Sequence, residues 1–190
     1  PRGAALPVAS GARVAVRQGF DVSPLDVGRE TDRAWLVACV WPGETARLNR
    51  LQAAIDAFRA LAGDAAPPRL AMSDLADVPE RLNALAQGTG APALHLAYQT
   101  VVRDYLTDAT RARYVEGMRR WVAAAEPQSP RIWVELEAPP GATSMAIEAH
   151  VASGTGAVLD LTLAWCGFHP DRVTPEADAV RAFTAATSAR

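Results

Sequence analysis

Carboxylates and aromatic side chains gather most densely between Gly19 and Leu61, so this is the stretch whose residue types could do chemistry. Asp21 and Asp26 stand on either side of a turn in which Pro24 holds the preceding residue extended. Two carboxylates held close together can bind a cation, and one of them can accept a proton if its pKa is raised. The alternative is that both carboxylates bond to backbone groups inside the turn, which is a common role of aspartate. Asp21 and Asp26 are candidate catalytic residues.

A second group in the same stretch suits the binding of a planar or anionic ligand. Arg47 and Arg50 flank the apolar seam of a predicted helix, and a guanidinium can hold a carboxylate or phosphate through two hydrogen bonds. Trp41, just before Pro42, can stack on a planar ligand. The alternatives are a solvated helix flank, with Arg47 paired to Glu44, and a tryptophan that covers the edge of a core. Trp41, Arg47 and Arg50 are candidate substrate-binding residues.

Polar residues also end three apolar runs that predict strands. These ends are Ser73-Asp74, Tyr98-Gln99 and Glu135–Glu137. A doubly wound sheet binds its ligands at the carboxyl ends of its strands. Ser73, Asp74 and Gln99 are therefore candidate cofactor-binding residues, and Tyr98 is a candidate substrate-binding residue. For Asp74 the alternative is an aspartate that starts a turn or caps a helix.

The histidines and cysteines give little support to a metal site. His95, His150 and His169 share no metal-ligand spacing, so no metal is expected from the order of residues along the chain. His169, in a loop after a strand, is the one histidine that we consider as an acid or base. Cys39 and Cys166 lie in apolar segments and predict buried free thiols. The motifs of serine hydrolases, nucleotide triphosphatases and zinc peptidases do not occur.

Apolar periodicity predicts the elements that must position these residues. Residues 1–12 are rich in proline, glycine and alanine, and they predict a linker or frayed arm, while residues 13–190 predict one α/β domain. Segments alternate between strand and helix, which favours a parallel sheet with covering helices and a closing β-hairpin. Predicted helices lie at 31–40, through 48–61, at 77–88, after Thr107 as N-cap, and from Thr174. The helix after Thr107 places an apolar stripe on one face: Tyr114, Met118, Trp121, Val122 and Ala125. Predicted strands lie at 69–74, 93–98, 131–137, 145–151 and 158–165. The seam from Leu48 to Leu61 is the strongest periodic signal and predicts core.

Composition bounds the class of protein. The chain has 190 residues, of which 49% are hydrophobic, and a formal net charge of −2. A nucleic-acid binder normally carries a basic surplus or stripe, and none is visible. No apolar run approaches the ~20 residues of a membrane span, and no signal sequence is visible at the start. A cytoplasmic protein that binds a small molecule, and neither nucleic acid nor a membrane, is the expectation.

Several motifs, in order, resemble a known bacterial family. They are G-F-D-V-S-P-L-D (19–26), A-C-V-W-P (38–42), R-L-N-R-L-Q-A-A-I (47–55), P-R-L-A-M-S-D (68–74), V-V-R-D-Y-L (101–106) and W-V-E-L-E (133–137). The chain resembles bacterial domain of unknown function family 2332. The resemblance implies a Rossmann-like fold of the kind found in S-adenosylmethionine-dependent methyltransferases, with a mostly parallel sheet and a C-terminal antiparallel hairpin. It implies no established reaction.

The resemblance also implies differences from the family pattern. A first strand and a glycine-rich loop would lie upstream, and because the chain begins at Pro1 rather than at methionine, it is expected to be the later portion of a longer domain. Gln99 stands where the family pattern implies a histidine, and Pro170 stands where it implies a glycine. A sheet without its first strand would expose an edge, which predicts a homodimer through that edge or a cover by the N-terminal arm.

Two functions follow as hypotheses. The first is S-adenosylmethionine-dependent methyl transfer to a small molecule, or binding of a nucleoside cofactor, as the resemblance implies. The alternative is a non-catalytic Rossmann-like module that binds a ligand or a protein, because no convergent nucleophile, base or metal set is visible and a fold does not fix a function.

Overall fold

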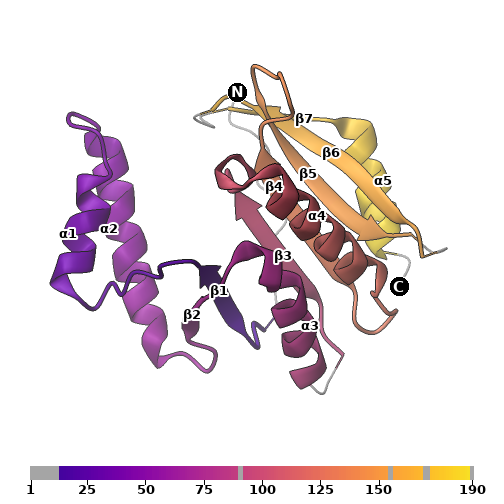
Figure 1. Cartoon of the computed structure of the whole chain (residues 1–190), viewed down its shortest axis with the longest axis horizontal. Coiled ribbons are helices and arrows are strands. Elements are labelled where there is room, and N and C mark those ends of the chain that lie inside the picture. Colours follow the sequence, from indigo (N-terminus) through magenta and orange to yellow (C-terminus); the bar gives the residue numbers. More distant parts are fainter. Residues whose placement is uncertain (1–12, 90–91, 154–155, 169–171, 189–190) are drawn as a thin grey trace. The chain divides into compact units, whose positions relative to one another are not determined.

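The computed structural model describes residues 13–89, 92–153, 156–168 and 172–188. The chain forms two compact units, Pro1–Asp74 (unit 1) and Leu75–Arg190 (unit 2), and each is described here by itself (Figure 1). None of the described helices is both long enough and apolar enough to cross a lipid bilayer.

Unit 1 is a small two-stranded sheet with a helical hairpin. Its elements are β1 (Arg17–Asp21), α1 (Glu30–Ala38), α2 (Thr45–Ala60), a 3-10 turn at Leu61–Gly63, and β2 (Pro68–Met72). β1 and β2 pair in parallel, from Arg17 beside Pro68 to Asp21 beside Met72. Between the two helices, Gly43 has a φ of 88°, a left-handed conformation that glycine adopts without a steric penalty.

The α2 seam is less buried than its periodicity predicts. Ile55 is the buried residue of the described helix, whereas Leu48 is exposed. Cys39, which was expected to be buried, is also exposed, while Cys166 is buried as expected. The physical reason is that a two-stranded sheet and one short helix offer too little apolar surface to cover a helix of this length.

Unit 2 contains one five-stranded sheet with helices. Its elements are a 3-10 turn at Leu75–Asp77, α3 (Val78–Gly88), β3 (His95–Thr100), a 3-10 turn at Arg103–Tyr105, α4 (Asp108–Ala123), β4 (Arg131–Glu137), β5 (Met145–Ala152), β6 (Val158–Cys166), β7 (Val173–Pro175) and α5 (Ala177–Ser188). The strands lie in chain order, from β3 at one edge to β7 at the other. The structure confirms the β5–β6 hairpin.

The expected mostly parallel, Rossmann-like sheet is not supported. Only β3 and β4 are parallel in the five-stranded sheet, and β4–β5, β5–β6 and β6–β7 are antiparallel. A parallel neighbour needs a long crossover connection, usually a helix. The described residues between β4 and β7 contain no helix, and each of these strands runs antiparallel to the one before it. The supported description is a mixed α/β fold.

Helices cover both faces of this sheet. On one face α4 buries Tyr114, Met118, Trp121 and Val122, in the stripe that the sequence predicts. Its N-cap is Thr107, as expected, and the Thr107 side chain accepts a hydrogen bond from the backbone N–H of Thr110. α5 packs on β5 and β6 from the opposite side, as Figure 1 shows.

One irregularity interrupts the regular pairing of β5 with β6. The register shifts between Ile147 and Glu148, so that Ile147 pairs with Ala164 whereas Glu148 pairs with Thr162. Leu163 is the extra residue of this β-bulge. A bulge changes which face the following side chains take.

Candidate functional site

The sequence-predicted residues of unit 1 lie at its surface or bond locally. Asp21 accepts a hydrogen bond from the backbone N–H of Ser23 at 2.7 Å, and Asp26 accepts one from that of Gly28 at 2.8 Å. These are the turn-internal bonds that the sequence offers as the alternative to catalysis. The turn therefore already engages one oxygen of each carboxylate.

The candidate binding residues of unit 1 do not form a described pocket. Trp41 is 76% exposed, and Arg47 pairs with Glu44 at 3.6 Å. Arg50 lies one helical turn after Arg47 on α2. None of these three side chains lines the hollow described below.

The remaining candidates are divided between the units. Ser73 is buried, donates its hydroxyl hydrogen to the carbonyl of Asp74, and belongs with Asp74 to unit 1. Tyr98 and Gln99 belong to unit 2, where Tyr98 is 78% exposed and Gln99 is buried. His169 lies outside the described residues. Gln99 is the one candidate that the structure surrounds with other buried polar groups.

These buried groups and their less buried neighbours form a polar cluster on the face of the sheet that α4 covers. We define the polar cluster as Gln99, Arg103, Tyr114, Glu135, Glu137, Glu148, His150 and Asp160. Strand alternation explains its position, because β4 places Trp133, Glu135 and Glu137 on one face. Burying this much polarity is costly unless each group is bonded.

Glu137 is held by donors from the end of β3. One of its oxygens, Oε1, accepts hydrogen bonds from Gln99 Nε2 at 3.0 Å, from Val102 N at 2.9 Å and from Arg103 N at 3.3 Å. The two backbone N–H groups converge because Val101 turns the chain with a φ of 51°, in the left-handed region. Successive N–H groups arranged in this way form a concave site for an anion.

Tyr114 links α4 to Gln99 of the polar cluster through a hydrogen bond. Its hydroxyl donates a short hydrogen bond to Gln99 Oε1, and Gln99 Nε2 in turn donates to Glu135 Oε2 at 3.2 Å. Burial raises the pKa of Tyr114, and the negative charges of Glu135 and Glu137 raise it further. The phenol is therefore a fixed donor at neutral pH.

His150 lies between two carboxylates. Its Nδ1 is 2.7 Å from Asp160 Oδ1, and its Nε2 is 3.3 Å from Glu135 Oε1. Burial lowers the pKa of His150, but the hydrogen bonds with Glu135 and Asp160 outweigh burial, so the pKa is raised overall. The imidazole stacks on Trp133, with ring centroids 4.2 Å apart. Both ring nitrogens and the ring plane are thus fixed.

Glu148 completes a possible metal-ligand set. It pairs directly with Glu135 across β4 and β5, and ligand atoms of Glu135, Glu148 and His150 all lie within 4.8 Å of one another. Two carboxylates and an imidazole at these separations can coordinate one ion. Glu135 is 1% exposed, so any ion held there would be largely shielded from solvent.

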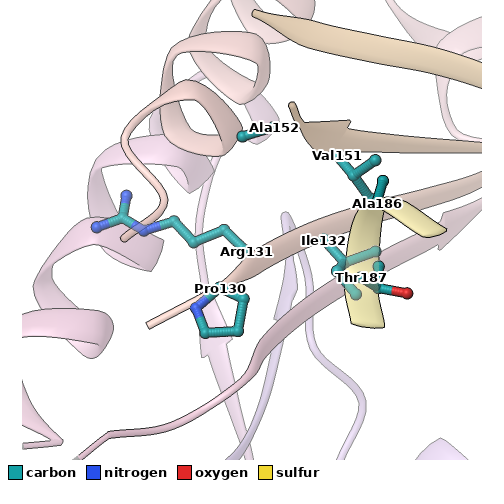
Figure 2. A pocket seen from close by; sticks show the side chains of 7 residues that line it. All are labelled: Pro130, Arg131, Ile132, Val151, Ala152, Ala186 and Thr187. Carbon is teal, nitrogen blue, oxygen red and sulfur yellow. The ribbon is translucent and has the colours of Figure 1, made fainter. Parts of the chain in front are cut away.

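A small hollow lies elsewhere in unit 2. Figure 2 shows it between the start of β4, the end of β5 and the last turn of α5, with Ile132, Val151 and Ala186 among its lining residues. Its empty volume is about 200 Å³, including space open to solvent. Pockets for drug-sized ligands occupy about 300–1,000 Å³, so this hollow is too small to be a substrate site.

Sequence reasoning missed Glu148 and His150. Their spacing of two residues on a strand places both on one face, and alternation in W-V-E-L-E places Glu135 and Glu137 likewise. The sequence shows each of these two alternating pairs by itself. Only the register of β4 with β5 brings them together, and spacing along the chain does not reveal it.

Comparison with known proteins identifies one family. The family described as "Uncharacterized protein conserved in bacteria (DUF2332)" matches residues 1–174. The matched range includes every member of the polar cluster. No curated protein and no solved structure matches the chain.

Proposed function

We propose that this chain, which belongs to the bacterial family DUF2332, binds one divalent metal ion through Glu135, Glu148 and His150, and that the ion serves catalysis. The single observation that carries the proposal is the close grouping of these three ligand atoms within 4.8 Å. The type of protein that follows is a metal-dependent enzyme acting on a small molecule.

Charge is the first support for an ion at this place. Like charges directly opposite each other on antiparallel strands destabilise a sheet, and Glu135 and Glu148 are such a pair. Arg103 offsets part of this cost, because its Nη2 lies 3.3 Å from Glu135 Oε1. Among the described residues, the ion pairs of the cluster reach Glu135 and Asp160 but not Glu148. A divalent cation would neutralise both glutamates.

Orientation of the histidine is the second support. Asp160 accepts the Nδ1 hydrogen of His150 in the tautomer that leaves the lone pair on Nε2, toward Glu135. A carboxylate behind a histidine ligand is a recurrent arrangement in metalloproteins, and it fixes both tautomer and ring orientation. Arg119 holds Asp160 in turn, at 2.7 Å.

The donor set indicates which ions suit the site and what they could do. Imidazole with two carboxylates suits Zn²⁺, Mn²⁺ or Fe²⁺, whereas Ca²⁺ and Mg²⁺ prefer oxygen ligands alone. Catalytic zinc sites use three protein ligands and keep a further position for water or substrate, while structural ones use four. Such an ion polarises a bound oxygen or lowers the pKa of a bound water.

Calorimetry on the chelator-treated protein tests this proposal. We expect binding of one Zn²⁺ per chain, weaker binding of Mn²⁺, and little heat from Mg²⁺. Glu148→Gln and His150→Gln should abolish the Zn²⁺ signal, and Asp160→Asn should weaken binding by about tenfold to a hundredfold. Glu116→Gln is the matched control, because Glu116 pairs with Arg120 on the exposed side of α4.

A second readout separates lost ligands from lost folding. An ion that binds the folded state raises the melting temperature by mass action. Zn²⁺ should therefore raise the melting temperature of the wild type and of Glu116→Gln, and leave that of a folded His150→Gln unchanged. A wild-type protein that takes up no ion and shows no thermal shift would refute the proposal.

Methyl transfer is a second candidate, supported by the sequence resemblance rather than by the sheet. Ser73, Asp74 and Gln99 are its predicted cofactor-binding residues. The Gln99 amide is engaged by Tyr114, Glu135 and Glu137, so a role in cofactor binding requires that these bonds rearrange. Calorimetry with S-adenosylmethionine tests it, and heat that Asp74→Ala abolishes would favour it over the metal-dependent reaction. Ligand or partner binding without turnover would instead favour the non-catalytic module.

A further inference from the structure

We propose that the outer edge of β3 is a self-association surface, at which two copies of the chain pair their β3 strands antiparallel about a two-fold axis through Tyr98. In the described part of the chain β3 pairs only with β4, so its other side is an edge of the sheet. The opposite edge, β7, has three residues and ends in Pro175, which limits strand pairing there.

The outer side of β3 offers a row of backbone groups to which an added extended chain can bond. His95 N donates to Pro130 O, and Val101 N donates to Leu136 O, so the backbone N–H and C=O groups of the odd-numbered residues point toward β4. Backbone groups alternate along a strand, and those of Leu96, Tyr98 and Thr100 therefore point outward. An added strand would bond to them by β-augmentation.

The side chains at this edge lack the usual protection. Residues 93–102 contain no carboxylate, no guanidinium and no proline, although such residues normally keep edge strands from pairing. Leu96 is 58% exposed and Tyr98 is 78% exposed. Both side chains lie on the face opposite Gln99, so pairing at this edge does not disturb the polar cluster.

A second copy of the chain fits this edge in two respects. The uncharged segment would meet an identical uncharged segment, so no like charges oppose each other. Antiparallel pairing about Tyr98 places Leu96 opposite the partner's Thr100, and Tyr98 opposite the partner's Tyr98. Every outward N–H and C=O of Leu96, Tyr98 and Thr100 then meets a complementary group, as in an isologous two-fold interface.

Sedimentation equilibrium on the full chain tests the pairing. The wild type should be dimeric at concentrations of tens of micromolar. Tyr98→Lys and Tyr98→Glu should each raise the dimer dissociation constant by about tenfold or more, because an aromatic pair is replaced by like charges directly opposite each other. An equimolar mixture of the two variants should recover the dimer, because opposite charges then meet.

A charge at the other edge serves as control. Thr174 on β7 is exposed, so Thr174→Lys should dimerise as the wild type does. Circular dichroism should show that all variants are folded. A monomeric wild type would overturn the proposal. A dimer that Tyr98→Lys leaves unchanged, or variants that stay monomeric when mixed, would overturn it as well, and would point to another surface or to a strand from a different protein.

Discussion

Val101 holds a backbone conformation that β-branched residues rarely adopt. Its φ of 51° lies in the left-handed region, where such a residue is strained by about 1–3 kcal/mol. The conformation aims two backbone N–H groups at Glu137. The strain is thus offset by the bonds that hold a buried carboxylate, in the segment that leads into the polar cluster.

Replacing Val101 tests this strain. Val101→Asn should raise the free energy of unfolding by about 0.5–1 kcal/mol, because asparagine tolerates the left-handed region. Val173→Asn, at an exposed position on β7, should leave stability unchanged or lower it. Urea denaturation at pH 7 measures both variants. A loss of stability in Val101→Asn would show that the conformation carries no strain.

Glu137 accepts hydrogen bonds from the backbone of this turn, and replacing it should lower the free energy of unfolding. Glu137→Ala removes the acceptor of three hydrogen bonds at a position that is 3% exposed. Leaving buried donors unsatisfied costs about 1–3 kcal/mol for each group, so we expect a loss of about 3 kcal/mol or more. Chemical denaturation measures it, with Glu126→Ala in the loop before β4 as control. A loss below that of the control would contradict the role assigned to Glu137.

His95 predicts a pH dependence outside the polar cluster. Burial lowers the pKa of His95, and the charge of Arg131 lowers it further. The unfolded chain therefore binds the proton more readily, and stability falls as pH drops through the ordinary histidine pKa of about 6.5. His95→Gln should lose less stability than the wild type between pH 7 and pH 5.5. An equal loss in urea denaturation of both proteins would contradict this.

At the scale of elements, the contact between α3 and α4 depends on one glycine. A Cβ added to Gly117 would lie 2.7 Å from Pro79 Cγ, whereas one added to Gly88 would meet nothing within 4 Å. Alanine is a better helix former than glycine by about 1 kcal/mol. We expect that the clash in Gly117→Ala outweighs this gain and lowers stability by about 1–2 kcal/mol.

Gly88→Ala is the matched control, since it changes the same residue type near the end of the neighbouring helix α3. It should be neutral or slightly stabilising. Thermal melts of the two variants decide the matter. If both gain stability, α3 and α4 adjust to a larger residue, and Gly117 is not required for their packing.

Some elements were predictable because local residues mark them. The stripe of α4, its Thr107 cap and the β5–β6 hairpin follow from local periodicity and turn residues. The α2 seam shows the limit of this reasoning. Periodicity tells which face of a helix would be buried, but the amount of burial depends on the area of the partner surface, and that is not a local property.

At the scale of the whole molecule, the polar cluster belongs to unit 2 alone. The hydrogen bonds and ion pairs of its described residues join positions between 99 and 162, within Leu75–Arg190. Residues 75–190, expressed alone, should therefore unfold cooperatively and bind Zn²⁺ with the affinity of the full chain. Circular dichroism and calorimetry measure the two properties. An unfolded product, or a loss of affinity, would show that the site depends on unit 1.

Strand pairing explains why the expected site differed from the observed cluster. Alternating strands and helices predicted a parallel sheet, and with it a ligand at the strand ends of Asp74 and Gln99. Sequence alone indicates the strands but not their order or direction. Glu135, Glu148 and His150 become neighbours only through the antiparallel register of β4 with β5, which results from the whole sheet.

The polar cluster depends on the register shift that the bulge introduces between Ile147 and Glu148. Successive side chains along a strand point to opposite faces of the sheet, so even- and odd-numbered residues lie on different faces. The extra Leu163 shifts this alternation by one residue in β6. If Leu163 joined the regular pairing instead, continuous pairing from Ile147 beside Ala164 would set His150 opposite Leu161 rather than Asp160. Deleting Leu163 would remove the bulge and keep His150 opposite Asp160, whereas a chain that retains Leu163 needs the bulge. A sequence must therefore preserve the register of β6 against β5, as well as the identity of Asp160, to keep this carboxylate behind His150.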